Sequence, residues 1–229
     1  YLRLAVHERS NAKGEVLLPL DEDTVRALVP VLRDNAVESV AITLMHSYAN
    51  AAHEQRIADI LRAELPDLWI TLSSEVCPEI REYERMSTAS ANAYVQPLMA
   101  SYLADLDARL RDEGAQCPLF MMTSGGGLTT VETARQHPIR LVESGPAGGA
   151  ILAGHIAMEC GLDKVLSYDM GGTTAKICLI DGGRPQTSRT FEVDRQYRFT
   201  KGSGLPLRIP VIEMVEIGAG GGSIAQIDN

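Results

Sequence analysis

The sequence predicts an α/β fold of mixed sheets with flanking helices. Three observations lead to this class. Apolar strand patterns alternate with helical patterns in the first half of the chain, and glycine-rich turns between strands gather in the second half. The composition, 45% apolar over 229 residues, is sufficient for a substantial core, which excludes a disordered chain.

Charge and cysteine content exclude several function classes. The chain has 21 Lys and Arg against 30 Asp and Glu, a net charge of -9, so nucleic-acid backbones would repel it. No apolar run reaches the ~18 residues of a membrane span. The spacing of the cysteines matches neither a metal site nor a disulfide scaffold, so we expect reduced thiols in a cytoplasmic protein. They are Cys77, Cys117, Cys160 and Cys178.

The first 73 residues predict strands and helices in alternation. Residues 1–9 and 15–18 have β-like patterns on either side of Gly14, which indicates a hairpin. Asp21 is a helix cap residue, and we expect Pro30 to bend the helix that follows. The remaining elements are a strand at 37–45, a helix at 50–65 capped by Asn50, and a strand at 69–73.

A long helix is predicted from about Arg81 to Arg111. Pro97 interrupts this pattern and Gly114 closes it. We place a domain boundary near the start of this helix, which divides the chain into residues 1–88 and 89–229. Because the first residue is Tyr1 and no secretory signal is visible, we expect an N-terminal part of the protein to lie outside this sequence.

The most informative segment runs from Lys164 to Ile180. An apolar strand ends in Asp169, a Gly-Gly-Thr-Thr turn follows, and a second apolar strand begins directly after it. Nucleotide-binding loops of the Walker and dinucleotide types lead from a strand into a helix, so neither of those applies. The sequence therefore predicts a strand–turn–strand hairpin with a candidate phosphate site at its bend.

The residue types of this bend suit a bound nucleotide. Glycine N–H groups and threonine hydroxyls are phosphate donors, and Asp169 is placed to hold Mg²⁺ through water or to orient an attacking water. We expect Gly172 to have a positive φ. Lys176, one of four lysines, is a further candidate ligand. The alternative is a plain hairpin turn with a surface lysine. The candidate phosphate ligands in the turn are Gly171, Gly172, Thr173 and Thr174.

Two other segments extend the candidate site. Glu143 precedes a predicted helix that has a face of small residues, and Ser144 is a candidate cap of that helix. The carboxylate of Glu143 therefore lies at a helix N-terminus, where the helix dipole favours anions. The glycines at 218–222 follow an apolar run and let the backbone approach a nucleotide or a substrate. The candidate ligands in this segment are Gly220, Gly221 and Gly222. A flexible loop is the alternative.

The order of these parts resembles a known ATPase superfamily. Glu143, a small-residue helix and Asp169 with its glycine turn are similar to the connecting helix and second phosphate motif of actin, hexokinase and heat-shock chaperones. Within that superfamily, the strings at 143–149, 169–173 and 216–225 resemble the hydantoinase/oxoprolinase family, specifically its N-methylhydantoinase A type of subunit. The likeness covers essentially the whole chain.

The resemblance implies a fold and an activity. The fold is ribonuclease-H-like with a partial two-lobe architecture, in which residues 1–88 end an N-terminal domain and 89–229 begin the ATPase domain. The activity is ATP-dependent phosphorylation of a cyclic amide of the hydantoin or 5-oxoproline class, and a second, B-type subunit completes ring hydrolysis. Asp169 and Glu143 are carried over as catalytic carboxylates, with Mg²⁺ held near Asp169. The first phosphate hairpin and the adenosine segment of the superfamily are not evident, which indicates an internal piece.

Two rival functions stay open. One is the β-type subunit of an ATP-dependent ketone carboxylase, which would use bicarbonate and a ketone such as acetone or acetophenone. The other is a non-catalytic nucleotide-sensing module, which would bind ATP and change shape without consuming a small substrate.

Overall fold

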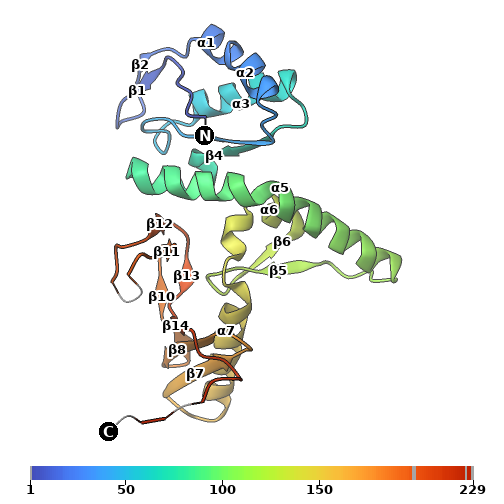
Figure 1. Cartoon of the computed structure of the whole chain (residues 1–229), viewed down its shortest axis with the longest axis vertical. Helices are drawn as coiled ribbons and strands as arrows, with labels where there is room; N and C mark the ends of the chain where they lie inside the picture. Colours follow the sequence, from blue (N-terminus) through green and yellow to red (C-terminus); the bar gives the residue numbers. More distant parts are fainter. Residues whose placement is uncertain (1, 198–199, 225, 228–229) are drawn as a thin grey trace. The chain divides into compact units, whose positions relative to one another are not determined.

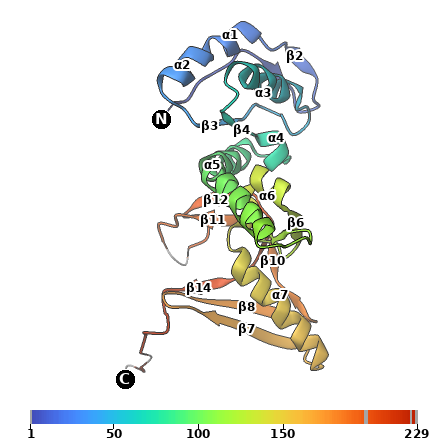
Figure 2. The ribbon, with the colours of Figure 1, turned by 90° about the vertical axis from the view of Figure 1, so that its right-hand side faces the viewer.

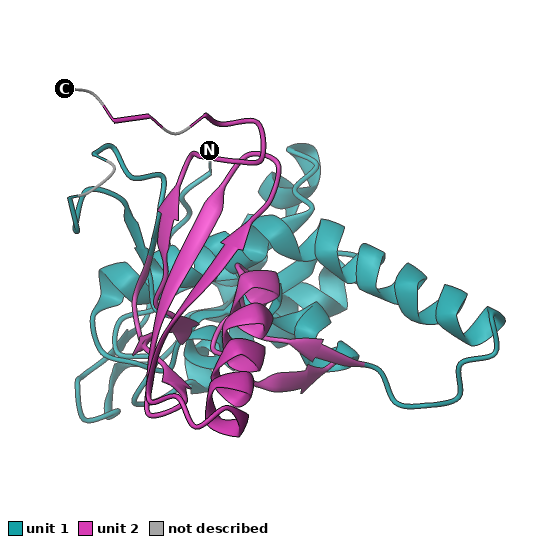
Figure 3. Cartoon of the chain, turned by 90° about the horizontal axis from the view of Figure 1, so that it is seen from below, with its two compact units in different colours: residues 1–119, 131–139, 192–208 teal, residues 120–130, 140–191, 209–229 magenta. Residues whose placement is uncertain are grey.

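The computed structural model describes residues 2–197, 200–224 and 226–227. Their contacts divide the chain into two compact units, which Figure 3 shows in different colours. Figure 1 shows the whole chain coloured along the sequence. Unit 1 comprises residues 1–119, 131–139 and 192–208, and unit 2 comprises residues 120–130, 140–191 and 209–229. Across the described ranges, no helix has both the length and the apolarity needed to cross a membrane.

Unit 1 contains a parallel β–α–β arrangement. Strands β3 and β4 pair in parallel with Ser39 opposite Trp69, and α3 connects them. The bounds in this unit are β1 Arg9–Ser10, β2 Val16–Leu18, α1 Glu22–Arg26, α2 Leu28–Asp34, β3 Ser39–Ile42, α3 Ala52–Glu64, β4 Trp69–Leu72, α4 Ser73–Val76, α5 Glu82–Asp112, α6 Val131–Gln136 and β12 Leu205–Leu207. Strand β11, Phe191–Val193, pairs with β12, and a 3-10 turn follows α6 at Pro138–Leu141.

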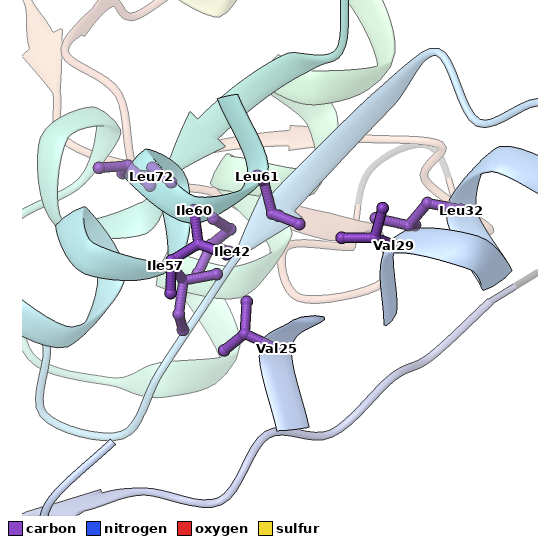
Figure 4. Packing of buried hydrophobic residues seen from close by; sticks show 9 residues of the cluster. Val25, Val29, Leu32, Ile42, Ile57, Ile60, Leu61 and Leu72 are labelled. Carbon is purple, nitrogen blue, oxygen red and sulfur yellow. The ribbon is translucent and has the colours of Figure 1, made fainter. Parts of the chain in front are cut away.

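The apolar core of unit 1 lies between the first three helices and this parallel pair. Figure 4 shows Val25 of α1, Ile57 of α3 and Ile42 of β3 within one cluster. This core buries Val25, Val29 and Leu32 and leaves Leu28 partly exposed, although these residues lie on two successive helices. The chain breaks at Ala27 because Pro30 has no N–H and its ring would clash with the carbonyl of Arg26 in a continuous helix.

Helix α5 corrects a second sequence-based prediction. We expected Pro97 to interrupt the helix, whereas α5 continues through it for 31 residues. A proline leaves the carbonyl four residues earlier without its helical donor. In this case the carbonyl of Ala93 accepts a hydrogen bond from Ser39 Oγ at 2.8 Å. The neighbouring strand thus replaces the hydrogen bond that Pro97 removes.

A buried polar network joins α3, α4 and α5 in unit 1. Glu54 is fully buried, and its carboxylate accepts hydrogen bonds from Leu44 N at 2.9 Å, Ser73 Oγ at 2.7 Å and Ser74 N at 2.9 Å. Arg85, only 1% exposed, donates from Nε to the same Ser73 hydroxyl at 3.1 Å. The serine hydroxyl thus lies between the two buried charges, and each charge has hydrogen-bond partners.

Unit 2 is built from a long hairpin and one covering helix. The bounds are β5 Phe120–Met122, β6 Leu128–Thr130, α7 Ser144–Glu159, β7 Lys164–Met170, β8 Ala175–Asp181, β9 Arg184–Pro185, β10 Thr187–Ser188, β13 Val211–Ile212 and β14 Val215–Ile217. The main sheet has the order β14-β8-β7, with β9 also paired to β8, and all its pairs are antiparallel. Together with the parallel pair of unit 1, this confirms the predicted class of mixed sheets with flanking helices.

Helix α7 covers one face of the β7–β8 hairpin, as Figure 2 shows. Its small residues Ala147 and Ala150 pack on Cys178 and Ile180 of β8. The helix also approaches the turn after β8 at Gly154, where an added Cβ would lie 2.6 Å from the carbonyl oxygen of Gly183. The opposite face of the sheet carries apolar side chains that are exposed in this chain: Leu166, Tyr168, Met170, Leu179 and Val215.

Candidate functional site: two glycine loops and a row of charges in unit 2

The predicted hairpin is present in the structure. Strands β7 and β8 pair antiparallel with Asp169 opposite Lys176 and Met170 opposite Ala175, and residues 171–174 connect them. Within the turn, Gly171 N donates to Thr174 O at 3.0 Å. Residues 171–173 are exposed, and so is Asp169 at the end of β7. The bend therefore lies at the surface of unit 2, and its aspartate lies outside the apolar core.

The second glycine loop lies directly against this turn. Residues 218–222 follow β14, and Gly221 N donates to Gly171 O at 3.0 Å. Gly220 is buried, and a Cβ added to it would overlap the carbonyl of Gly172 and the amide of Thr173. Ser223 closes the loop, because its Oγ accepts from Gly220 N at 3.1 Å. The structure thus brings together two glycine-rich segments that the sequence separates.

This contact changes the explanation for the glycines. We expected Gly172 to have a positive φ, but neither Gly171 nor Gly172 lies in the left-handed region. A Cβ on either residue would meet nothing within 4 Å. Backbone conformation therefore does not require glycine at these two positions. The steric requirement lies at Gly220, where the two backbones are too close for any side chain.

A row of charged side chains crosses the sheet beside the turn. Asp169 of β7 and Glu216 of β14 are the two cross-strand neighbours of Lys176 on β8. Directly opposed residues in antiparallel strands place their side chains on the same face of the sheet. Lys176 Nζ lies 3.7 Å from Glu216 Oε1. Sequence reasoning did not select Glu216 as a site residue, because the strand register that aligns it with Lys176 is not visible in the sequence.

Glu143 reaches the same lysine from the start of α7. Its Oε2 lies 2.5 Å from Lys176 Nζ. Burial lowers the pKa of Lys176, but the hydrogen bond and charge of Glu143, with the charge of Glu216, outweigh it and raise that pKa above its usual value. Lys176, predicted as a phosphate ligand, is therefore engaged with two carboxylates in this structure.

The start of α7 differs from the predicted cap. Ser144 is the first helical residue, and Glu143 occupies the cap position with φ 59 and ψ 20, a left-handed conformation that non-glycine residues rarely adopt. No side chain caps the helix. The carboxylate of Glu143 is directed to Lys176 and not to the helix amides, so it forms an ion pair and no capping hydrogen bond.

The turn at 171–174, the glycine loop at 218–222 and the carboxylates beside them form one corner of unit 2. The donor groups of this corner suit an anion together with a hard cation. Exposed glycine amides and threonine hydroxyls are phosphate donors, and carboxylate oxygens are the ligands that Mg²⁺ prefers. Across the described residues, no three His, Cys, Asp or Glu side chains gather as a metal site. Mg²⁺ commonly takes one or two carboxylates and fills its remaining positions with water and substrate phosphates, which matches this arrangement.

Comparison with known proteins agrees with this architecture. The hydantoinase/oxoprolinase family model matches residues 85–229, and the model of that family's N-terminal region matches residues 1–65. The chain is 37% identical to the caprolactamase subunit alpha of Pseudomonas jessenii over 229 residues, which is all of this chain and 32% of that protein. It is 31% identical to the 5-oxoprolinase of Saccharomyces cerevisiae, covering 91% of this chain and 15% of that protein.

Solved structures give the same result. The crystal structure of ATP-dependent caprolactamase from Pseudomonas jessenii superposes with a TM-score of 0.80 at 36% identity, over 98% of this chain and 31% of that chain. A nucleotide-free structure of acetone carboxylase also gives a TM-score of 0.80, at 27% identity, over 97% of this chain and 30% of that chain. The chain spans about a third of the length of the caprolactamase and acetone carboxylase chains and 15% of the 5-oxoprolinase. From the family models and these similarities together, the chain belongs to the hydantoinase/oxoprolinase family.

Proposed function

We propose that this chain is part of an ATP-dependent subunit that activates a cyclic amide of the hydantoin or 5-oxoproline class by phosphoryl transfer, for ring opening. The observation that carries the proposal is the contact between the two glycine loops beside the exposed Asp169. It holds an exposed turn, with its threonine hydroxyls and a neighbouring carboxylate, at one surface corner of unit 2, as binding of a triphosphate requires.

Each residue of the corner has a proposed role. The amide of Gly172 and the hydroxyls of Thr173 and Thr174 bind phosphate oxygens. Gly171 shapes the turn, because its N–H donates to Thr174 O, and the loop at 220–222 supports the turn through the hydrogen bond from Gly221 N to Gly171 O. Asp169 holds the hydration shell of Mg²⁺ or orients the attacking group, and Glu143 is the second carboxylate. Mg²⁺, when bound, would neutralise charge on the phosphates. The γ-phosphoryl group passes to the amide oxygen and ADP leaves, so the activated ring carbon becomes open to hydrolysis.

The relatives support a cyclic amide over other substrates. Caprolactamase and 5-oxoprolinase, both named for cyclic amides, are similar to this chain at 37% and 31% identity. Acetone carboxylase has the same TM-score at lower identity, which keeps a ketone-carboxylase role as the second candidate. The caprolactamase relative is named as a subunit. We therefore propose a second, B-type subunit as partner. The cytoplasmic location expected from the cysteines stays a prediction.

The test is an ATPase assay of the complete subunit with its partner. Hydantoins, 5-oxoproline and caprolactam are each added, and acetone or acetophenone is added with bicarbonate in parallel. Stimulation of ATP hydrolysis by a cyclic amide supports the proposal. Stimulation only by a ketone with bicarbonate favours the carboxylase, ATP binding without turnover on any substrate favours a sensor, and absence of ATP binding rules out the site.

A further inference from the structure

Lys176 is the positively charged residue at the centre of the candidate nucleotide corner, and its contacts differ from those of a phosphate-binding lysine. Its ammonium is within 4 Å of two carboxylates that come from different elements, Glu143 before α7 and Glu216 on β14. Asp169, its cross-strand neighbour on β7, is the third carboxylate of this region. The lysine side chain is 17% exposed, so water screens these pairs only in part.

Binding phosphate would require this ammonium to leave its present partners. An ammonium has three N–H donors; one donates to Glu143 Oε2, and Glu216 Oε1 lies 3.7 Å from the same Nζ as an ion-pair partner. Without Lys176, the carboxylates of Glu143 and Glu216 would lie close together with no cation between them, beside the proposed binding site for negatively charged phosphates. Like charges at such distances are unfavourable, so a proton or a solvent cation would take the place of the ammonium.

Glu143 gives the second reason to assign a positioning role. Its left-handed backbone at the helix start is unfavourable for a residue with a side chain, and such conformations persist only where surrounding interactions hold them. Its side chain does not cap its own helix, and the ion pair with Lys176 is the interaction that directs it. Lys176 therefore connects the entry of α7 to the sheet that carries the phosphate turn.

We propose that Lys176 is the internal counter-cation of the nucleotide corner: it positions Glu143 and Glu216 and does not bind phosphate. The kinetic part of its test rests on the proposed function, because it measures ATP turnover. It separates two roles for the same residue, because loss of a phosphate ligand raises the KM for ATP, whereas loss of a counter-cation that positions the carboxylates lowers kcat.

The experiment uses the full-length subunit with its partner and four variants. Lys176→Met removes the charge, Lys176→Arg retains it, Lys176→Met with Glu216→Gln also removes one carboxylate, and Lys164→Met is an exposed control lysine on β7. We expect Lys176→Met to lower kcat for ATP turnover by about tenfold or more, because Glu143 loses the ion pair that positions it. The KM for ATP should change less than about threefold, and Lys176→Arg, which keeps the charge, should restore most of the wild-type kcat.

The double variant makes the test decisive. If Lys176 balances the two carboxylates, adding Glu216→Gln should reverse part of the loss of turnover caused by Lys176→Met. The same reversal is expected in the unfolding midpoint, which needs no nucleotide and remains informative if Lys176→Met alone folds poorly or if the proposed function fails. A KM for ATP raised by about tenfold or more, with an unchanged kcat and no reversal by Glu216→Gln, would overturn the proposal while leaving the ATP-dependent function in place.

Discussion

Gly220 lies in direct backbone contact with Gly172, and any side chain at position 220 would overlap the carbonyl group of that residue. The hydrogen bond from Gly221 N to Gly171 O, at 3.0 Å, holds the two loops in this arrangement. Glycine at 220 is therefore required by packing between loops and not by its own φ, which lies outside the left-handed region. The shape of the candidate phosphate turn depends on this contact.

Gly220→Ala should weaken Mg-ATP binding to the full-length subunit by about tenfold or more, because the added methyl group forces the second loop away from the turn. The measurement is the dissociation constant from titration calorimetry. Gly222→Ala is the matched control, since a Cβ at Gly222 meets nothing within 4 Å, and its affinity should equal that of the wild type. Equal affinity of all three proteins would remove the second loop from the site.

Asp169→Asn should lower substrate-dependent ATP turnover at least about 100-fold with little change in the unfolding midpoint. The variant keeps the size of the side chain and loses the charge that we assign to Mg²⁺ or to the attacking group. The control is Asp181→Asn, an exposed residue at the opposite end of the same hairpin, opposite Lys164. Steady-state kinetics of the complete complex provide the comparison, and turnover retained in Asp169→Asn would contradict the assigned role.

Glu54→Gln should destabilise unit 1 by about 1–3 kcal/mol, because the new amide group places a donor against a backbone N–H that now donates to the carboxylate. The free energy of unfolding is measured by urea denaturation of the subunit. Glu64→Gln, on the exposed end of the same helix, should change it by less than about 0.5 kcal/mol. A small effect at Glu54 would mean that this buried network relaxes around the substitution.

Glu22 gives a pH dependence whose sign follows from its partners. Hydrogen bonds from Arg56 and Arg26, together with their charges, lower the pKa of Glu22 from 4.5 to about 2. A lowered folded-state pKa contributes stability above pH 4.5, and that contribution is lost as the pH falls toward 2. The difference in unfolding midpoint between wild type and Glu22→Gln should therefore shrink over this window. Because these groups are exposed, the difference should be small and should decrease in high salt. A difference that grows with acid would contradict the assignment.

Much of unit 2 was predictable because its signals are local. The β7–β8 hairpin follows from two apolar runs joined by Gly-Gly-Thr-Thr, and α7 follows from its small residues before Gly161. The same local reasoning failed at Pro97, since the donor that replaces the lost helical hydrogen bond is Ser39 on a distant strand. It also failed at Ser144, because the choice of Glu143 as the cap residue depends on Lys176 across the unit.

The sequence by itself determined which segments of this protein become strands, helices and glycine turns, because those choices depend on side-chain periodicity and on backbone freedom over a few residues. Only the tertiary structure decided what those segments contact. The pairing of Lys176 with Glu143 and Glu216, and the seating of Gly220 on Gly172, depend on strand register and helix placement. Register and placement are settled by burial of the whole core, so no short stretch of sequence specifies them.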